Sequence, residues 1–482
     1  MDVLLINPPY PRRHGSSSIE PIGLLGLSAV LRQAKAEVAI LDLAARLPQY
    51  SYSQDDLDAI TALLLPYLTA APRLVGIGPV TTAALRPVHD ILEVVKQNSS
   101  AATVIGGPLC AAPGIEKVVG SYLAADLYVA GDGETPIERI WQATCAGSPL
   151  RVLDDNVPGI GAPGSRRPPA YWSDDLDSIP VPDRGLVGES TASVRRNIDD
   201  RRTTAAFLSR GCPYSCTFCA APITSGRRVR RFSSQRVTAE VKSCQEHGYG
   251  DIIFYDDCLF VRGAQLNARI EEFASSLHAA GWSGVYQLEL RADAVVAMSD
   301  QALQSLVRTG CRQVNMGLEK GHAAALHQMR KRLAPEVARQ AVERLNEVGV
   351  RAAGTFIIGG LGETPTDAAA VAEYAASLSL DFAHFNPLAI YPGTRLYEDV
   401  FGDQHWLPLC LDEKWAPRGD ILWRSAEMSL SDILDGVARA YEQFYTPARL
   451  PSTLSRAPKA EHESIRQAYD ILRDKRSLSW AC

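Results

Sequence analysis

The chain is organised around one stretch, Arg210-Gly211-Cys212-Pro213-Tyr214-Ser215-Cys216-Thr217-Phe218-Cys219. Its three cysteines have the spacing C-x3-C-x2-C, and the next cysteine, Cys244, falls in a helical pattern. Thiolates are soft ligands that suit zinc or iron–sulfur clusters. Structural zinc sites and electron-transfer clusters take four protein ligands, whereas this run supplies three. A four-iron cluster held by three thiolates keeps one iron open for a substrate, which favours catalysis over electron storage.

This stretch resembles the signature of the radical S-adenosylmethionine (radical SAM) superfamily, including the aromatic Phe218 before the last cysteine. The resemblance implies a [4Fe–4S] cluster on Cys212, Cys216 and Cys219, whose open iron binds S-adenosylmethionine. One electron from the cluster then yields a 5′-deoxyadenosyl radical, which abstracts hydrogen from a substrate. The alternatives are three buried cysteines without a ligand, or a zinc site that takes a fourth ligand from elsewhere.

Composition is that of an ordinary globular protein. The 482 residues predict about two to four domains, and the formal net charge of −6 argues against a nucleic-acid platform. The ten cysteines are scattered apart from the triplet, so they do not form a disulfide framework. The first residues lack a secretory signal pattern, and no apolar run is long enough to span a bilayer. We therefore expect a cytoplasmic protein with neither a membrane nor a nucleic-acid partner.

Residues 1–145 alternate short apolar runs with helical patterns. Runs at 3–6, 38–41, 74–78, 102–105 and 127–130 read as strands, with helices between them. This alternation predicts an α/β domain with a doubly wound, Rossmann-like parallel sheet. Ligands of such sheets lie beyond the carboxyl ends of the strands, where this sequence places several glycines. Glycine lets a bare backbone approach a ligand closely.

The pattern of strand ends resembles the cobalamin-binding domain that precedes many radical SAM cores. The resemblance implies that the cobalamin tail and corrin edge lie against Gly106, Gly107, Gly131, Gly133 and Glu134. The motif Asp-x-His-x-x-Gly, which supplies a histidine to cobalt in other cobalamin domains, is absent. We therefore read His14 and His89 as a loop and a helix residue rather than as cobalt ligands.

The loop after the third predicted strand would then lie at the lower face of the corrin. Its residues are Val80, Thr81 and Thr82. Without a histidine ligand below it, cobalt would pass on a methyl group or a radical from its open upper face. A domain that has lost cobalamin is the alternative.

Residues 146–200 are rich in proline and glycine and predict a linker. From residue 201 to about 400, six strand–helix units follow, which predict a partial (β/α)6 barrel. Barrel enzymes carry their chemistry at the carboxyl ends of the strands, and the polar features of this segment fall there. Residues 401–482 read as a small helical C-terminal region.

The family resemblance assigns roles to residues at these strand ends. Tyr255, Asp256 and Asp257 would contact the amino group of S-adenosylmethionine, since a carboxylate suits an ammonium. Glu319 would bind the ribose, and the backbone of Phe218 the adenine. Glu289 and Arg291 would hold the carboxylate of S-adenosylmethionine or the substrate. The glycine-rich fifth strand would run along the adenine, at Gly354, Ile358 and Gly360. Each carboxylate could instead belong to a salt-bridged strand end.

The basic run Arg227-Arg228-Val229-Arg230-Arg231 is typical of a solvated loop, and an anionic partner is the alternative. A nucleic-acid site would need more basic residues and interleaved aromatic side chains. The basic run therefore adds no evidence for a function, and the family resemblance remains the main evidence.

Taken over the whole chain, the resemblance implies a cobalamin-dependent radical SAM enzyme with three cofactors: the [4Fe–4S] cluster, S-adenosylmethionine and cobalamin. The favoured activity is C-methylation of a small-molecule, natural-product intermediate, with electrons from a low-potential donor such as flavodoxin or ferredoxin. One alternative is a non-methylating radical rearrangement, cyclisation or oxidation. Another is a cobalamin or iron–sulfur sensor without catalysis. The sequence does not name the substrate.

Overall fold

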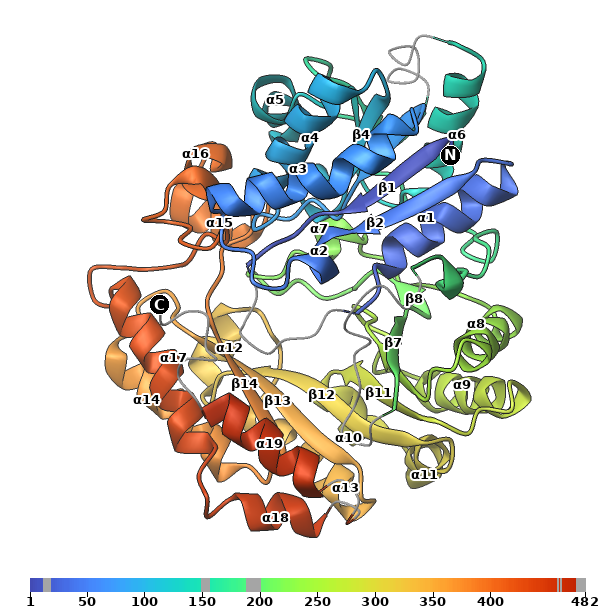
Figure 1. The fold of residues 1–482 in the computed structure, drawn as a ribbon. Coiled ribbons are helices and arrows are strands. Elements are labelled where there is room, and N and C mark those ends of the chain that lie inside the picture. Colours follow the sequence, from blue (N-terminus) through green and yellow to red (C-terminus); the bar gives the residue numbers. More distant parts are fainter. Residues whose placement is uncertain (12–18, 149–156, 188–200, 457–458, 460–461, 474–482) are drawn as a thin grey trace.

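The computed structural model describes residues 1–11, 19–148, 157–187, 201–456, 459 and 462–473, and His14 lies outside them. Two six-stranded sheets form its two halves, with the N-terminal half stacked on the larger second half (Figure 1). In both sheets the strands have helices packed against them (Figure 1). The α/β class expected from the alternating pattern is confirmed.

The first sheet has the order β2-β1-β3-β4-β5-β6. Its first five strands are parallel, and they are β1 (Val3–Asn7), β2 (Val38–Asp42), β3 (Leu74–Ile77), β4 (Ala102–Gly106) and β5 (Leu127–Val129). The helical segments between and after them are α1 (Ile22–Gln33), α2 (Leu43–Arg46), α3 (Gln54–Thr69), α4 (Leu85–Asn98), η1 (Pro108–Ala111), α5 (Ile115–Val118), η2 (Val119–Leu123) and α6 (Glu134–Cys145). Residue Ser53 caps α3 through a capping box with Asp56. Strands buried on both faces read as continuous apolar runs, which is why their positions could be predicted.

The predicted linker contributes to this sheet. Residues Ile160–Gly161 form β6, which pairs antiparallel with β5, and Tyr171 bridges to Gly131. The short helix η4 (Arg184–Val187) follows, and Arg184 forms a buried ion pair with Glu240 at 2.6 Å. The described part of the linker therefore joins the two halves through pairing and charge rather than running free between them. Its remaining residues, 149–156 and 188–200, lie outside the described residues.

The second sheet is entirely parallel and has the order β14-β13-β12-β11-β10-β7. Its strands are β7 (Thr203–Ala206), β10 (Asp251–Phe254), β11 (Val285–Leu290), β12 (Cys311–Glu319), β13 (Arg351–Ile358) and β14 (Phe382–Pro387). The helices after the cysteine stretch are α7 (Ala221–Thr224), α8 (Ser234–Glu246), α9 (Leu266–Ala279), α10 (Ala292–Ala297), α11 (Asp300–Arg308), α12 (Ala323–Gln328), α13 (Pro335–Glu347) and α14 (Pro365–Ser377). Strand order follows chain order and the two edge strands do not meet, so this is the expected partial barrel.

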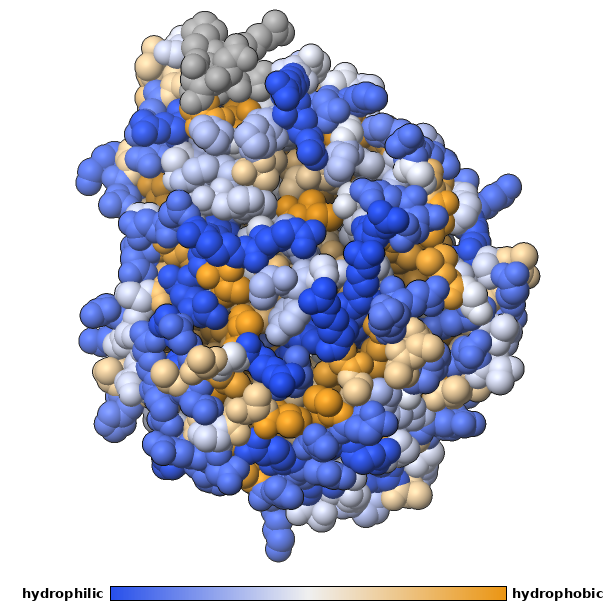
Figure 2. All heavy atoms as spheres, turned by 180° about the vertical axis from the view of Figure 1, so that it is seen from behind, coloured by the Kyte–Doolittle hydropathy of each residue, from blue (hydrophilic) through white to orange (hydrophobic). Residues whose placement is uncertain are grey.

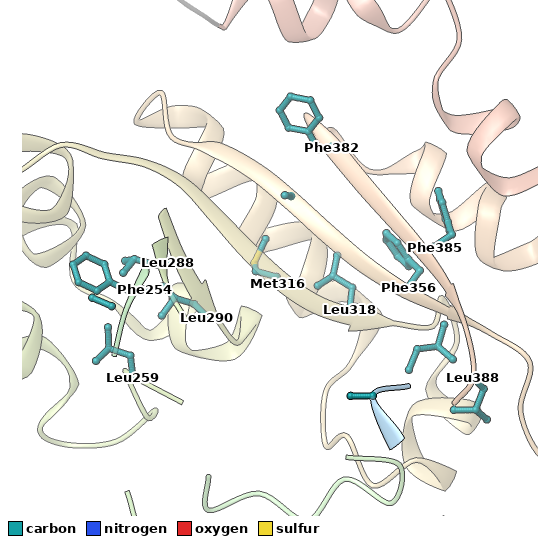
Figure 3. Packing of buried hydrophobic residues seen from close by; sticks show 14 of the residues in the cluster. Phe254, Leu259, Leu288, Leu290, Met316, Leu318, Phe356, Phe382, Phe385 and Leu388 are labelled. Carbon is teal, nitrogen blue, oxygen red and sulfur yellow. The ribbon is translucent and has the colours of Figure 1, made fainter. Parts of the chain in front are cut away.

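The core of the partial barrel is formed by apolar side chains of neighbouring strands. Residues Phe254, Leu288, Met316, Phe356 and Phe385 come from five adjacent strands and are completely buried (Figure 3). Burying such a side chain contributes about 1.5–3 kcal/mol to folding. A two-stranded ribbon, β8 (Ser209–Arg210) with β9 (Arg230–Arg231), extends from the barrel beside the cysteines. The first barrel strand ends at Ala206, and the ribbon begins at Ser209.

The C-terminal region is helical, as expected. Its helices are α15 (Arg395–Phe401), α16 (Trp406–Leu411), α17 (Leu430–Phe444), α18 (Leu450–Ser455) and α19 (His462–Arg473). Residues Tyr441 and Tyr445 cap the backbone of the edge strand β14. The amides of Phe385 and Ala383 donate to their hydroxyls at 3.2 and 2.9 Å. An edge strand with unpaired amides is prone to association, and these hydroxyls remove that risk here.

The surface opposite the view of Figure 1 is largely hydrophilic, with apolar side chains showing between polar ones (Figure 2). Among the described residues, no helix is both long and apolar enough to cross a bilayer.

Candidate active site

The three cysteines lie on the loop between β8 and α7, with Cys212 buried and the other two half-buried. Gly211 has φ +97°, and a Cβ there would lie 2.4 Å from the carbonyl oxygen of Arg228, so this position requires glycine. The loop is attached to the end of α12 and to the start of α15. The Thr217 amide donates to Met329 O at 3.0 Å, and the Leu396 amide donates to Thr217 O at 2.9 Å.

The thiols differ in their environment. A hydrogen bond with Cys258 lowers the pKa of Cys212. Burial raises the pKa of Cys216, and it raises the pKa of Cys219 to about 11. Among the described residues, no three His, Cys, Asp or Glu side chains are grouped so as to hold one metal ion. A cluster does not need such convergence, because each thiolate binds a different iron.

A cavity of about 570 Å³ connects the two halves of the molecule. It begins on the face of the first sheet covered by α1 and α6, and it passes the carboxyl ends of β1, β3, β4 and β5. It continues to the barrel side, where Phe207, Ser209, Arg210, Tyr255 and Asp257 line it. The cavity therefore reaches from the core of the N-terminal half to the residues beside the cysteine loop.

Several predicted cobalamin residues line this cavity, namely Gly106, Gly107, Gly131, Gly133 and Glu134. Their roles differ. A Cβ at Gly106 would meet nothing within 4 Å, so this glycine leaves open space. A Cβ at Gly107 would lie 2.3 Å from the Val80 amide nitrogen, and one at Gly131 would lie 2.2 Å from Tyr171 O. Gly107 and Gly131 are therefore required by the packing of the chain itself.

Glu134 forms an ion pair with Arg210, which lies at the start of the cysteine loop. The guanidinium of Arg210 donates to its two carboxylate oxygens at 2.6 and 3.0 Å and also forms an ion pair with Asp132 at 3.1 Å. Despite burial, this guanidinium holds the pKa of Glu134 below its usual value. Asp132 also pairs with Arg230. The basic run is thus divided. Arg230 is buried and links the two halves, whereas Arg228 is exposed and pairs with Asp174 at the surface, as expected for a solvated loop.

The predicted lower-face loop is held by its surroundings. The Val80 amide donates to Gly106 O at 2.8 Å, and Thr81 Oγ1 accepts from the Ala84 amide at 3.1 Å. Thr82 donates its hydroxyl to Asp420 of the C-terminal region. Val80 and Thr82 are buried. None of the three is among the lining residues of the cavity. His89, which we read as a helix residue, stacks on Tyr122 with ring centroids 4.4 Å apart.

The triplet Tyr255-Asp256-Asp257 divides into two environments. Tyr255 and Asp257 line the cavity, whereas Asp256 is buried and accepts from Ser209 Oγ at 2.6 Å and the Leu208 amide at 3.0 Å. Burial raises the pKa of Asp256 to about 7. Asp256 therefore shapes the loop before the cysteines, and only Asp257 of the two carboxylates faces the cavity.

Most of the remaining predicted residues lie in or just after β11, β12 and β13. Glu319, with φ +62°, accepts from Lys331 Nζ at 2.8 Å, and Lys331 was not singled out from the sequence. Arg291 pairs with Asp293 and lies over the ring of Tyr214 at 3.9 Å. Glu289 accepts from Asn315 at 2.9 Å, and burial raises its pKa to about 7. Phe218 packs on the barrel core. Gly354 and Ile358 lie in β13, and Gly360 follows it.

Comparison with known proteins agrees with this arrangement. Residues 207–375 match the model of the radical SAM superfamily. An uncharacterized methyltransferase of Pyrococcus horikoshii is 25% identical over 454 residues, 92% of this chain and 92% of that protein.

Two solved structures have a similar fold. The radical S-adenosylmethionine methyltransferase TsrM from Kitasatospora setae, with cobalamin and a [4Fe–4S] cluster bound, has a TM-score of 0.64 at 18% identity. The alignment covers 96% of this chain and 90% of TsrM. Another structure of TsrM contains its tryptophan substrate. The cobalamin-dependent S-adenosylmethionine radical enzyme OxsB, with aqua-cobalamin and S-adenosylmethionine bound, has a TM-score of 0.69 at 15% identity. The alignment covers 98% of this chain and 71% of OxsB.

Proposed function

Because the chain belongs to the radical SAM superfamily and has the fold of its cobalamin-dependent members, we propose that it is a C-methyltransferase that acts on a small molecule. The observation that carries this proposal is the cavity of about 570 Å³ that joins the N-terminal sheet to the cysteine loop. A methyl donor held by one half and a radical source held by the other could meet there. The methyltransferase similarity and the tryptophan substrate of TsrM support methylation of a small molecule.

The chain fits cobalamin on its N-terminal half. The inner part of the cavity lies between the sheet and α1, and Leu5, Leu24 and Ile137 make it apolar. Cβ atoms at Gly23 and Gly106 would both point into open space, so the chain leaves room for a bulky group. These residues would hold the cofactor tail, and the strand ends would lie under the corrin. We assign residues 1–145 and the strand β6 to this function.

The chain fits the cluster and S-adenosylmethionine on residues 201–400. The residues Cys212, Cys216 and Cys219 share one loop and would hold the cluster. Asp257 and Tyr255 face the cavity beside it and would bind the amino group of S-adenosylmethionine. Glu319 would bind the ribose, and its orientation is fixed by Lys331. When bound, these groups supply a 5′-deoxyadenosyl radical, and cobalamin supplies a methyl group.

The task of the protein chain is then positioning. Hydrogen abstraction from carbon needs no general base, so the residues around the cavity orient the reactants and exclude water. The segments at residues 391–394 and 418–420 contact the N-terminal half of the molecule. A Cβ at Gly393 would lie 2.7 Å from Pro113, and one at Gly419 would lie 2.4 Å from Ala83. The C-terminal region therefore closes one side of the space between the two halves. An oxygen-sensitive cluster fits a reducing cytoplasm, which is where we place the enzyme.

The proposal can be tested anaerobically. The chain is reconstituted with iron, sulfide and cobalamin, reduced, and given S-adenosylmethionine together with candidate small molecules. S-Adenosylhomocysteine and 5′-deoxyadenosine are quantified together with any methylated product. Formation of both with a methylated product supports C-methylation. 5′-Deoxyadenosine without S-adenosylhomocysteine would show a non-methylating radical reaction, and neither product with an intact cluster would contradict radical chemistry.

A further inference from the structure

Residues Met329 to Arg332 form a short segment next to the cysteine loop. The carbonyl of Met329 accepts a hydrogen bond from the amide of Thr217 at 3.0 Å, and Thr217 lies between two of the cluster cysteines. The carbonyl of Lys331 accepts from the Arg291 guanidinium at 3.0 Å. The backbone carbonyls of the segment thus hold it to the cysteine loop and to Arg291. Its side chains take no part in these hydrogen bonds.

The side chains of this segment alternate between inside and outside. Arg330 and Arg332 are exposed, whereas Lys331 between them is buried and donates to Glu319. Both arginines have left-handed backbone conformations, with φ of +51° and +52°. This conformation is unfavourable for a residue with a Cβ, so glycine would be the relaxed choice at both positions. The chain instead places two long cationic side chains there.

The charges of these two arginines are not used inside the molecule. Glu319 neutralises Lys331, and Asp293 neutralises Arg291. Within the described ranges, neither Arg330 nor Arg332 takes part in a salt bridge. The chain as a whole carries a net charge of −6. An acidic protein would be attracted locally to these two arginine charges, which we call the Arg330–Arg332 surface.

We propose that the Arg330–Arg332 surface is the docking site for a small acidic flavoprotein electron donor of the flavodoxin type. This inference rests on the proposed function, because a cluster on the cysteine loop has to be reduced from outside. One electron leaves the flavin hydroquinone of the donor, which becomes the semiquinone, and lowers the charge of the cluster by one. The surface is connected to the cysteines by a short path. It runs along the backbone from Arg330 to Met329, through the hydrogen bond to Thr217, and along the backbone to Cys216.

The test compares three double variants of the full, reconstituted chain. R330E/R332E reverses both charges. R330G/R332G removes both charges and suits the left-handed backbone. R139E/R466E makes the same charge change at exposed arginines of α6 and α19, away from the cysteine loop, and is the matched control. The probe is reduced flavodoxin, whose affinity is measured by fluorescence titration at low and at physiological salt.

We expect wild-type affinity to fall with salt, and R330E/R332E to weaken binding about tenfold or more. R330G/R332G should weaken it less, and R139E/R466E should bind as wild type does. Stopped-flow oxidation of the flavodoxin hydroquinone should slow in the same order, while reduction of the cluster by dithionite stays equal in all four proteins. Equal flavodoxin affinity for R330E/R332E and R139E/R466E would overturn the proposal. If docking follows this order but 5′-deoxyadenosine never forms, the proposed activity fails and the docking surface stands.

Discussion

Arg210 of the cysteine loop and Glu134 at the start of α6 form an ion pair with two hydrogen bonds, at nitrogen–oxygen distances of 2.6 and 3.0 Å. The two residues are 76 positions apart and lie in different halves of the molecule. Asp132 and Arg230 extend the pair into a network of four largely buried charges. The loop that carries the cysteines is therefore fixed directly to the half of the molecule that would hold cobalamin.

This network gives a first prediction for stability. Arg210→Met would leave Glu134 without its cation in a buried position, which costs about 3 kcal/mol when one partner of a buried pair is removed. Arg32→Met removes an ion pair with Asp183 whose side chains are about half exposed, and such pairs contribute about 0–1 kcal/mol. Urea denaturation of the two variants should show this difference. Equal losses would mean that the network does not stabilise the contact between the halves.

Two adjacent glycines give a second prediction, because they differ in function. Gly106→Val puts a side chain into the open cavity, so the variant should fold normally and lose cobalamin. Gly107→Ala should instead lower thermal stability, because position 107 has φ +137° and a Cβ would lie 2.3 Å from the Val80 amide nitrogen. Calorimetry and the absorption of bound cobalamin measure the two effects. Full cobalamin loading of Gly106→Val would contradict the assigned site.

Much of the fold could be predicted because its strands are buried on both faces. The strands Val3–Asn7 and Val38–Asp42, for example, fall on the apolar runs at 3–6 and 38–41. The strand Ile160–Gly161 could not be found this way, since two residues carry no period and only pairing with β5 makes them a strand. The link between Arg210 and Glu134 likewise depends on how two distant loops meet, which no local pattern encodes.

The directions of the site side chains were harder to predict than the strands. Tyr255-Asp256-Asp257 shows the physical reason. Side chains alternate between the two sides of an extended chain, so neighbours cannot all face one cavity. Reading the triplet as one unit overlooked this alternation. The cavity receives Tyr255 and Asp257, and Asp256 turns to Ser209. The period of the preceding strand could have separated the two carboxylates.

This separation gives a third prediction. Asp256→Ala removes the acceptor of two buried hydrogen bonds and should cost about 1–3 kcal/mol of stability. Asp257→Ala removes the acceptor of the Gly211 amide, at 3.3 Å, so it should cost less stability than Asp256→Ala. It should weaken binding of S-adenosylmethionine roughly tenfold, since a charge-assisted hydrogen bond contributes about 1.5–3 kcal/mol. Thermal unfolding and equilibrium dialysis on the reconstituted proteins measure these effects. The reverse assignment of the two losses would show that Asp256 is the ligand.

The last prediction concerns pH and Glu289. Burial raises the pKa of this carboxyl group to about 7 in the folded protein, from an ordinary value of about 4.3 when unfolded. Between these two values the folded state binds the proton more tightly, so the free energy of unfolding falls as pH rises. Glu289→Gln removes this dependence and can still accept from Asn315. The variant should gain little relative to wild type at pH 5 and about 2 kcal/mol at pH 8. Urea denaturation at both pH values measures the gain.

Asp300→Asn is the control, because its carboxylate is 97% exposed and pairs with Arg344 at the surface. A gain for Glu289→Gln that is the same at both pH values would show that Glu289 ionises normally and that its environment is more open to water than the fold indicates.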